Sequence, residues 1–310
     1  GAGSIRINGR AERAVWQIFN DHREALVPNS FFAVRGKKAA GKPVVRAVQT
    51  APVGPLPAMK GLTFRGEYPF GWYEFQDPEL PVKVALETFS PLVPLCAKDS
   101  AIPCAIFNVS AENPADQPVE VSFLAAQQNA VGYLGDAPIQ GRSYRGYGGN
   151  ANKVLRGEKS TQLHMTSTKP LDVPGSGDMV LMAMAEAEGV PAWESLEELA
   201  SQFTASGTVQ GNLSPGRSPD GQTLDGALVV RFVLKPGEKR TVPFVLTWCF
   251  PAAQHGVKGW NAPGNMYANW WPDALSVARD LENRLEELTQ RTRLYHDALY
   301  ASNLPYWLLD

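Results

Sequence analysis

The stretch LVVRFVLKPGEKRTVPFVLTW, residues 228–248, carries the clearest fold signal in the chain. Its apolar side chains recur at every second position in two runs, first at Leu228, Val230, Phe232 and Leu234 and then at Val242, Phe244, Leu246 and Trp248. Such alternation is typical of strands with one buried face. Between the runs, Pro236 and Gly237 suit the central positions of a type II turn, which needs a positive φ at the second of them. The stretch predicts two long strands of a sandwich, joined as a β-hairpin.

Further strands are predicted on the N-terminal side of this stretch. Residues 82–87 alternate, and residues 105–111 and 119–123 alternate on either side of the turn-rich segment 113–118, which predicts a second hairpin-like pair. The run Met179–Ala185 is apolar throughout, as in a strand that is buried on both faces. With 28 glycines and 25 prolines, the composition favours many short strands joined by turns.

Two segments show helical spacing instead. Residues 193–203 place apolar side chains on one side and glutamates on the other, which predicts a short surface helix. From Pro272 onward a single apolar stripe repeats every three or four residues, at Leu281, Leu285, Leu288, Thr292, Tyr295 and Leu299. This helix should end near Ser302, because Pro305 restrains the residue before it.

These patterns predict a mainly β fold, a large antiparallel β-sandwich with a long C-terminal α-helix. We expect the sandwich to span residues 1–271 and a connector that contains the helix to span residues 272–310. The chain opens abruptly at Gly1, so we expect its N-terminus to be truncated; no signal peptide is recognised, and the compartment is left open.

Charge and cysteine content exclude several classes of function. The 29 basic and 31 acidic residues give a net charge of -2, so we expect no nucleic-acid partner. No apolar run is long enough for a membrane span. Cys96, Cys104 and Cys249 lie in apolar stretches and are expected to be reduced core residues, with a Cys96–Cys104 disulfide as the alternative. Neither their spacing nor that of the histidines predicts a metal site, and no cofactor is expected.

Two aromatic regions are candidates for binding. The first surrounds Trp72, where Glu67, Glu74, Asp77 and Glu79 are interleaved with aromatic residues; packing of a strand and its turn is the stronger interpretation of this cluster. The second is the loop before the long helix, with Trp260, Asn261, Tyr267, Asn269 and Trp270. Tryptophan and asparagine beside glycines suit either a carbohydrate-binding lip or a domain interface, and we favour the interface.

Several of these segments together resemble a known family. GEYPFGWYEF at 66–75, DPELPVKV at 77–84 and ETFSPLVP at 87–94 resemble the N-terminal domain of glycoside hydrolase family 116, which includes bacterial β-glucosidases and the non-lysosomal glucosylceramidases. The likeness continues at AKDS (97–100) and GTV (207–209), and SNLPYW (302–307) resembles the junction with the family's catalytic domain.

The resemblance implies a β-sandwich packed against the catalytic (α/α)6 barrel of a retaining β-glucosidase. In that family the catalytic carboxylates lie in the barrel, which would follow Asp310, so no catalytic residue is expected in this chain. The expected function is that of a supporting domain, inactive alone, whose partner is the catalytic domain that follows it. Alternatives are a module that binds a β-glucoside glycan and a stand-alone interaction scaffold whose helix mediates dimerisation.

Overall fold

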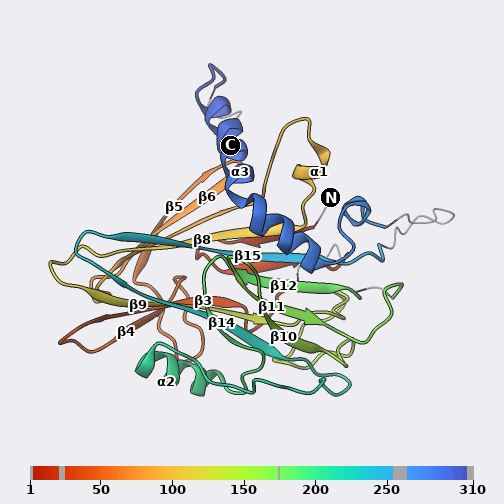
Figure 1. The fold of residues 1–310 in the computed structure, drawn as a ribbon, viewed down its shortest axis with the longest axis horizontal. Coiled ribbons are helices and arrows are strands. Elements are labelled where there is room, and N and C mark those ends of the chain that lie inside the picture. The colour runs from red at the N-terminus through yellow and green to blue at the C-terminus, as the bar shows by residue number, and fades with distance from the viewer. Residues whose placement is uncertain (1–2, 21–24, 174, 254–263, 306–310) are drawn as a thin grey trace.

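A computed structural model describes residues 3–20, 25–173, 175–253 and 264–305 and shows a layered β-sandwich (Figure 1). Two antiparallel sheets, of eight and five strands, pack face to face. Helix α3 (Ala274–Tyr300) covers the outer face of the larger sheet, and α2 (Leu196–Ser206) covers the outer face of the smaller one. The predicted mainly β architecture with a long C-terminal helix is confirmed.

The strands are arranged as follows. The eight-stranded sheet has the order β10 (Ala151–Arg156), β11 (Thr161–Thr166), β12 (Asp178–Ala183), β15 (Lys239–Cys249), β8 (Cys104–Glu112), β7 (Lys83–Phe89), β6 (Phe70–Gln76) and β5 (Gly61–Glu67). The five-stranded sheet has the order β13 (Glu188–Val190), β14 (Asp225–Leu234), β9 (Val119–Gln128), β3 (Phe31–Lys38) and β4 (Val44–Ala47). A ribbon of β1 (Ser4–Ile7) and β2 (Arg13–Gln17), the short helix α1 (Ala97–Ser100) and a 3-10 turn, η1 (Met266–Asn269), complete the described elements.

The two predicted hairpins are wrong in their pairing, although their strands exist. β14 pairs with β9 and β13, whereas β15 pairs with β8 and β12 in the other sheet. The turns at 113–118 and 235–238 therefore each carry the chain from one sheet to the other, as arches. Alternation shows only that one face of each strand is buried. Two consecutive strands show the same alternation whether they are neighbours in one sheet or face each other across the core from two sheets.

The two arches lie side by side and are joined by one buried amide. Asn113 Nδ2 donates to the carbonyl oxygens of Gln117 (2.8 Å) and Leu234 (3.0 Å). The backbone of Asn113 also pairs with Gly237 and Glu238 in the neighbouring arch. Gly237 has a φ of 73°, the left-handed value that the type II turn requires.

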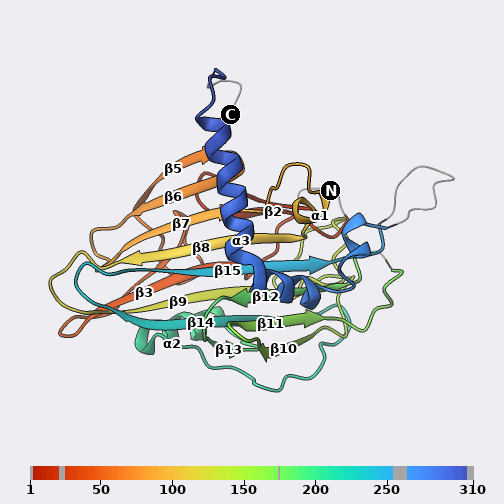
Figure 2. The ribbon, with the colours of Figure 1, turned by 45° about the horizontal axis from the view of Figure 1, so that its top comes forward.

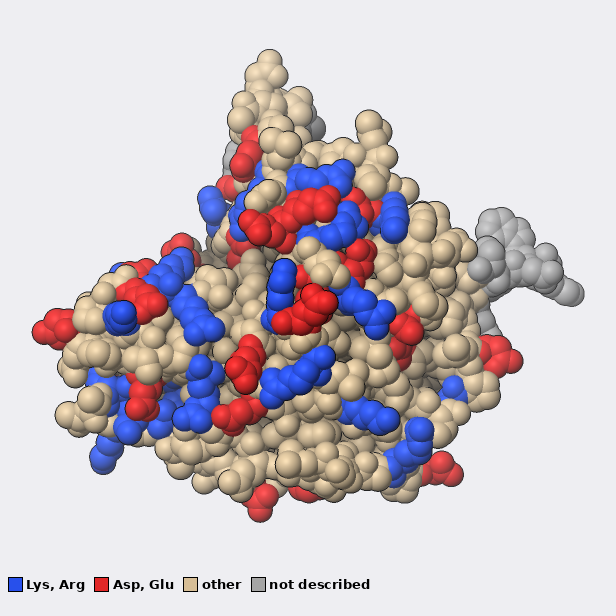
Figure 3. Space-filling model, in the orientation of Figure 1, with Lys and Arg blue, Asp and Glu red and all other residues tan. Residues whose placement is uncertain are grey.

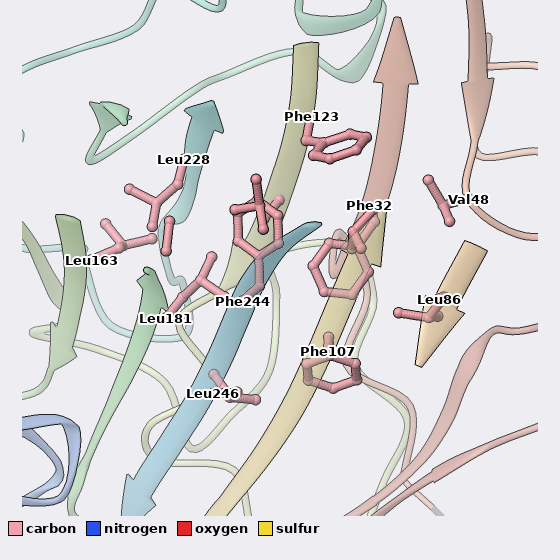
Figure 4. Close-up of a cluster of buried hydrophobic side chains, with 14 of the residues drawn as sticks. Phe32, Val48, Leu86, Phe107, Phe123, Leu163, Leu181, Leu228, Phe244 and Leu246 are labelled. Carbon is pink, nitrogen blue, oxygen red and sulfur yellow. The ribbon is translucent and has the colours of Figure 1, made fainter. Parts of the chain in front are cut away.

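Aromatic side chains from both sheets fill the space between them (Figure 4). Phe32 of β3 lies 5.2 Å from the ring of Phe107 on β8 and 5.5 Å from that of Phe244 on β15. Burial of such rings supplies much of the hydrophobic free energy of a sandwich. The sheets are therefore held together by an aromatic cluster near their centres.

The β1–β2 ribbon contributes a buried cation to this core. The Arg13 guanidinium lies 4.6 Å from the ring centre of Phe32 and 5.5 Å from that of Phe107. It donates to Gln127 Oε1 and to the carbonyl oxygen of Ala126, both at 3.2 Å. Burial lowers the pKa of Arg13 to about 9. Aromatic faces and amide oxygens thus take the place of water around this charge.

Three further sequence predictions are confirmed. β12 is buried at every position, with Met182 facing α3 and Leu181 facing the other sheet. The short surface helix is α2, which begins after the N-cap Ser195. All three cysteines are free, so the alternative disulfide is excluded. Among the described helices, none is both long and apolar enough to cross a bilayer.

α3 follows the predicted stripe and crosses the strands of the larger sheet from β12 to β5 (Figure 2). Leu281, Leu288 and Thr292 are buried against the sheet. The helix begins with a capping box, in which Asp273 Oδ1 accepts a hydrogen bond from Ser276 N at 2.7 Å. It ends at Tyr300, close to the predicted end.

Two leucines on α3 allow a matched test of this docking. Leu281 is fully buried, whereas Leu294 is 71% exposed. We expect Leu281→Ala to lower the free energy of unfolding by roughly 2–5 kcal/mol, because it leaves a cavity in the seam. Leu294→Ala should change it by no more than about 0.5 kcal/mol. Urea denaturation of both variants measures the difference, and equal losses would show that α3 is not docked as described.

Candidate functional site

The two ends of the sandwich differ in the length of their connections. The arches at 113–118 and 235–238 and the turn at 77–82 are short and lie at one end. The long connections 90–103 and 129–150 leave the opposite end. Binding residues are usually carried by long loops on a rigid scaffold. The long-loop end is therefore where a site is expected.

A groove of about 760 Å³ opens at this end, beside the turn between β5 and β6. Phe64 and Tyr68 are 50% and 59% exposed, so part of each ring is open to a partner. Glu67 supplies a carboxylate to the wall. The remaining walls are mostly apolar and come from the ribbon, from β6 and from the connection after β7, including Ile5, Ile7, Phe70, Tyr73 and Leu92.

Trp72 lies next to this groove, in the seam between β6 and α3. Its indole N–H donates to Glu87 Oε2 at 2.7 Å. The Arg65 guanidinium lies 4.2 Å from the centre of the indole ring, and Phe70 stacks beside it at 5.4 Å. Surrounded in this way, the indole serves to join the sheet to the helix. These contacts within the chain agree with the packing interpretation of the cluster around Trp72.

Glu87 is the centre of the same seam. Besides Trp72, its carboxylate accepts hydrogen bonds from Asn108 Nδ2 (2.9 Å) and from Arg293 on α3 (2.6 and 2.7 Å). Burial by itself raises the pKa of Glu87. The hydrogen bonds from Arg293, Asn108 and Trp72, together with the positive charge of Arg293, outweigh burial, so the net pKa is lowered. The ionised form is therefore stabilised by docking of the helix.

A second ion network ties α1 to the same helix. Asp99 is buried and pairs with Arg284 (3.0 Å) and Arg291 (2.8 Å). Burial raises the pKa of Asp99, yet the two arginines outweigh it and the net pKa is lowered. Acidic and basic side chains alternate over the outer surface of α3 (Figure 3). This face of the helix is therefore polar where it is not docked.

The candidates before α3 lie at the other end of the helix from Trp72. Tyr267, on η1, is buried, and its hydroxyl pairs with both the N–H (3.0 Å) and the carbonyl (3.1 Å) of Phe250. Burial raises the pKa of Tyr267 well above its usual value. Asn269 is exposed, and Trp270 is half-buried with its ring edge-on to Trp271 at 5.8 Å. Trp260 and Asn261 lie outside the described residues.

The structure therefore separates the predicted candidates into two places. Tyr267 anchors the start of the helix, Asn269 and Trp270 stand beside it, and Trp72 supports the far end. The acidic cluster is also divided: Asp77 and Glu79 both pair with Arg46, while Glu67 lies beyond the opposite end of β6. At about 3.3 Å per residue, β6 places the two parts on the order of 20 Å apart. They cannot act as an acid and base on one glycosidic bond.

One polar centre at the long-loop end was not predicted. The buried Asp225 accepts hydrogen bonds from Arg142 Nε (2.6 Å), Gln128 Nε2 (3.0 Å) and Asn29 Nδ2 (2.7 Å). Burial raises the pKa of Asp225, and these partners offset the rise only in part. Arg142 also bonds to the carbonyl of Glu194, so it joins the 129–150 connection to the start of β14 and to the segment before α2. Within the described residues, no group of three or more His, Cys, Asp or Glu side chains could hold a metal ion.

Comparisons with known proteins give one family match over most of the chain and several distant structural similarities. A family model described as "beta-glucosidase 2, glycosyl-hydrolase family 116 N-term" matches residues 1–288. One similar solved structure is titled "Putative kojibiose phosphorylase from human microbiome"; the identity is 9%, the match covers 89% of this chain and 32% of that chain, and the TM-score is 0.40. Another is a polysaccharide lyase, with 10% identity, coverage of 80% of this chain and 32% of that chain, and a TM-score of 0.42. An α-galactosidase of family 36 from Geobacillus stearothermophilus is also similar, with 13% identity, coverage of 63% of this chain and 26% of that chain, and a TM-score of 0.28. This chain spans about a third of the length of the first two.

The seam around Glu87 predicts how stability depends on pH. A carboxyl group whose pKa is lowered by folding stabilises the fold above its pKa in the unfolded chain, about 4.3, and this contribution fades as pH falls through the lower pKa of the folded state. We expect Glu87→Gln to lower the free energy of unfolding most near neutral pH, with a loss that shrinks below about pH 4.

Urea denaturation at several pH values measures this loss. Glu74→Gln, at an exposed position on β6, is the matched control and should show little effect throughout. A loss at Glu87 that stays constant from pH 7 to about pH 3 would contradict the described ion pair.

Proposed function

Because the chain belongs to the family of glycosyl-hydrolase family 116 N-terminal domains, we propose that it is the supporting β-sandwich of a β-glucosidase. In this proposal residues 1–271 form the sandwich and residues 272–310 connect it to a catalytic (α/α)6 domain that follows. The sandwich would hold the connector in place and contribute a rim to the substrate pocket.

The observation that carries the proposal is the position of α3. Its first turns are buried on β12 and β15, and only its end reaches beyond β5, the edge strand of the sheet (Figure 2). Leu294, on α3, and Leu304, which follows the helix, are both exposed. A helix that is fixed along most of its length and projects past its own sheet is suited to setting the direction of the next domain.

The carboxylates of the chain are consistent with this role. Retaining glycosidases need two carboxyl groups about 5–5.5 Å apart that are free to react. Glu87, Asp99 and Asp225 are each engaged by arginine side chains, and Glu67 is engaged by His296. Groups held in this way serve structure, which supports a catalytic pair in the following domain.

The proposal also assigns the candidates near the start of α3. Asn269 and Trp270 stand at the surface where the connector begins, and Trp260 and Asn261 precede them in the sequence. We assign these four residues to the interface with the following domain. Tyr267 and Trp72, which are held within the sandwich and the seam, would position that interface from beneath.

Activity of two forms of the protein tests the proposal. Residues 1–310 alone should not hydrolyse 4-nitrophenyl β-glucoside, whereas the same chain extended by its downstream coding sequence should. Circular dichroism and a cooperative urea transition confirm that the shorter form is folded. Hydrolysis by residues 1–310 alone would overturn the proposal, as would an extended protein that is folded but inactive on β-glucosides.

A second function, glycan binding, is favoured by the groove beside the β5–β6 turn. Its two half-open rings, Phe64 and Tyr68, are the kind of surface on which sugars stack. Titration calorimetry of residues 1–310 with cellobiose and laminarin oligosaccharides, compared with Tyr68→Ala, tests it. Binding that Tyr68→Ala weakens by about tenfold, or roughly 1.4 kcal/mol, would favour this function, and no heat of binding would exclude it for these glycans.

A further inference from the structure

A histidine–carboxylate pair holds each end of α3: His164 and Asp178, both on the sheet, at the start, and His296 of the helix with Glu67 of β5 at the end. At the start, Asp178 Oδ1 accepts a hydrogen bond from Ala274 N at 2.9 Å, and Asp178 Oδ2 lies 2.9 Å from His164 Nε2. At the end, His296 Nε2 lies 3.0 Å from Glu67 Oε2, in the turn that closes β5. The two pairs differ in the number of ring nitrogens of the histidine that must carry a proton.

His296 faces a carboxylate with each of its two nitrogens. Besides the contact with Glu67, its Nδ1 lies 2.8 Å from Asp297 Oδ1. Ionised carboxylates only accept hydrogen bonds, so both contacts are formed at once only when both nitrogens carry a proton. The ring also stacks on Tyr300, with centroids 4.7 Å apart, and an aromatic face attracts a cation. The arrangement is complementary to the charged imidazolium.

The other groups around His296 leave this arrangement intact. From β5, Arg65 pairs with the second oxygen of Glu67 at 3.5 Å. From α3, Arg293 is directed to Glu87 of β7. β6 presents the uncharged rings of Phe70 and Trp72, each edge-on to His296 at 5.5 Å. Glu67 thus lies between two basic side chains, and Asp297 faces largely toward solvent.

A neutral ring would change these contacts at one end of the helix only. One nitrogen of neutral His296 would become an acceptor facing a carboxylate oxygen, so one hydrogen bond would be replaced by repulsion. The carboxylate contact of His164, by contrast, is through Nε2 alone, and a neutral ring can still donate through that nitrogen. Loss of a proton therefore weakens the end of α3 and spares its start.

We propose that His296 is a pH-sensitive latch, which fastens the last two turns of α3 to the β5–β6 turn when charged and releases them when neutral. The latch stabilises docking while both ring nitrogens carry a proton, and its contribution is lost when the ring gives one of them up. The role of the latch, to release the connector that leads to a following domain, rests on the proposed function. The latch itself belongs to residues 1–310 and is tested on this chain.

Hydrogen exchange measured by mass spectrometry, converted to protection factors, tests the latch between about pH 5.5 and 8.5, where histidine changes charge. Protection of residues 293–300 should fall by about tenfold or more as pH rises, the effect of losing one charge-assisted hydrogen bond. Protection of residues 274–281 should not change. Uniform protection of residues 293–300 over this range would overturn the proposal.

Three variants separate the latch from ordinary packing. His296→Gln can donate to Glu67 but does not titrate, so the pH dependence of residues 293–300 should disappear. Glu67→Gln replaces one carboxylate by an amide that can donate to or accept from Nε2, so the pH dependence of residues 293–300 should weaken. His164→Gln is the matched control at the other end of α3 and should leave the pH response of residues 293–300 unchanged. A response that persists in His296→Gln would overturn the latch, whatever the outcome of the hydrolysis test.

Discussion

The constraint on which the rest of the structure depends is the lateral packing of two arches through Asn113. Because each arch carries the chain between the sheets, pairing the arches aligns β8 with β15 in one sheet and β9 with β14 in the other. The centre of both sheets is thus set by a single contact region. It also forces the long connections to the opposite end, where the groove and the Asp225 centre lie.

Local periodicity revealed which segments are strands or helices but not which strands are neighbours. β7, β12, β14, β15 and both longer helices follow from apolar spacing, since each buries one face or both. The arches were mistaken for hairpins because a turn with Pro236 and Gly237 looks the same in both. The strands of the ribbon were missed, since both are short and β2 begins with a buried polar residue, Arg13.

The sequence indicated which residues are candidates but not which of them lie together. Aromatic density identified Trp72 and Tyr267, but their roles depend on partners far away in the sequence, such as Glu87 and Phe250. His296 was not among the predicted site residues. A signal for its burial was nevertheless present, because Leu288, Thr292 and His296 are spaced by four on the buried stripe. Glu67, separated from it by 229 positions, could not be read from spacing.

The path of α3 across the larger sheet has a consequence for how the protein is made. Its contacts come from strands that are synthesised at very different times, from β5 near the beginning to β15 just before the helix. Such contacts close long loops of chain and form late in folding. During synthesis, α3 can form all of its contacts only after the sheet has assembled. Complete docking of α3 therefore marks the point at which the sandwich itself is finished.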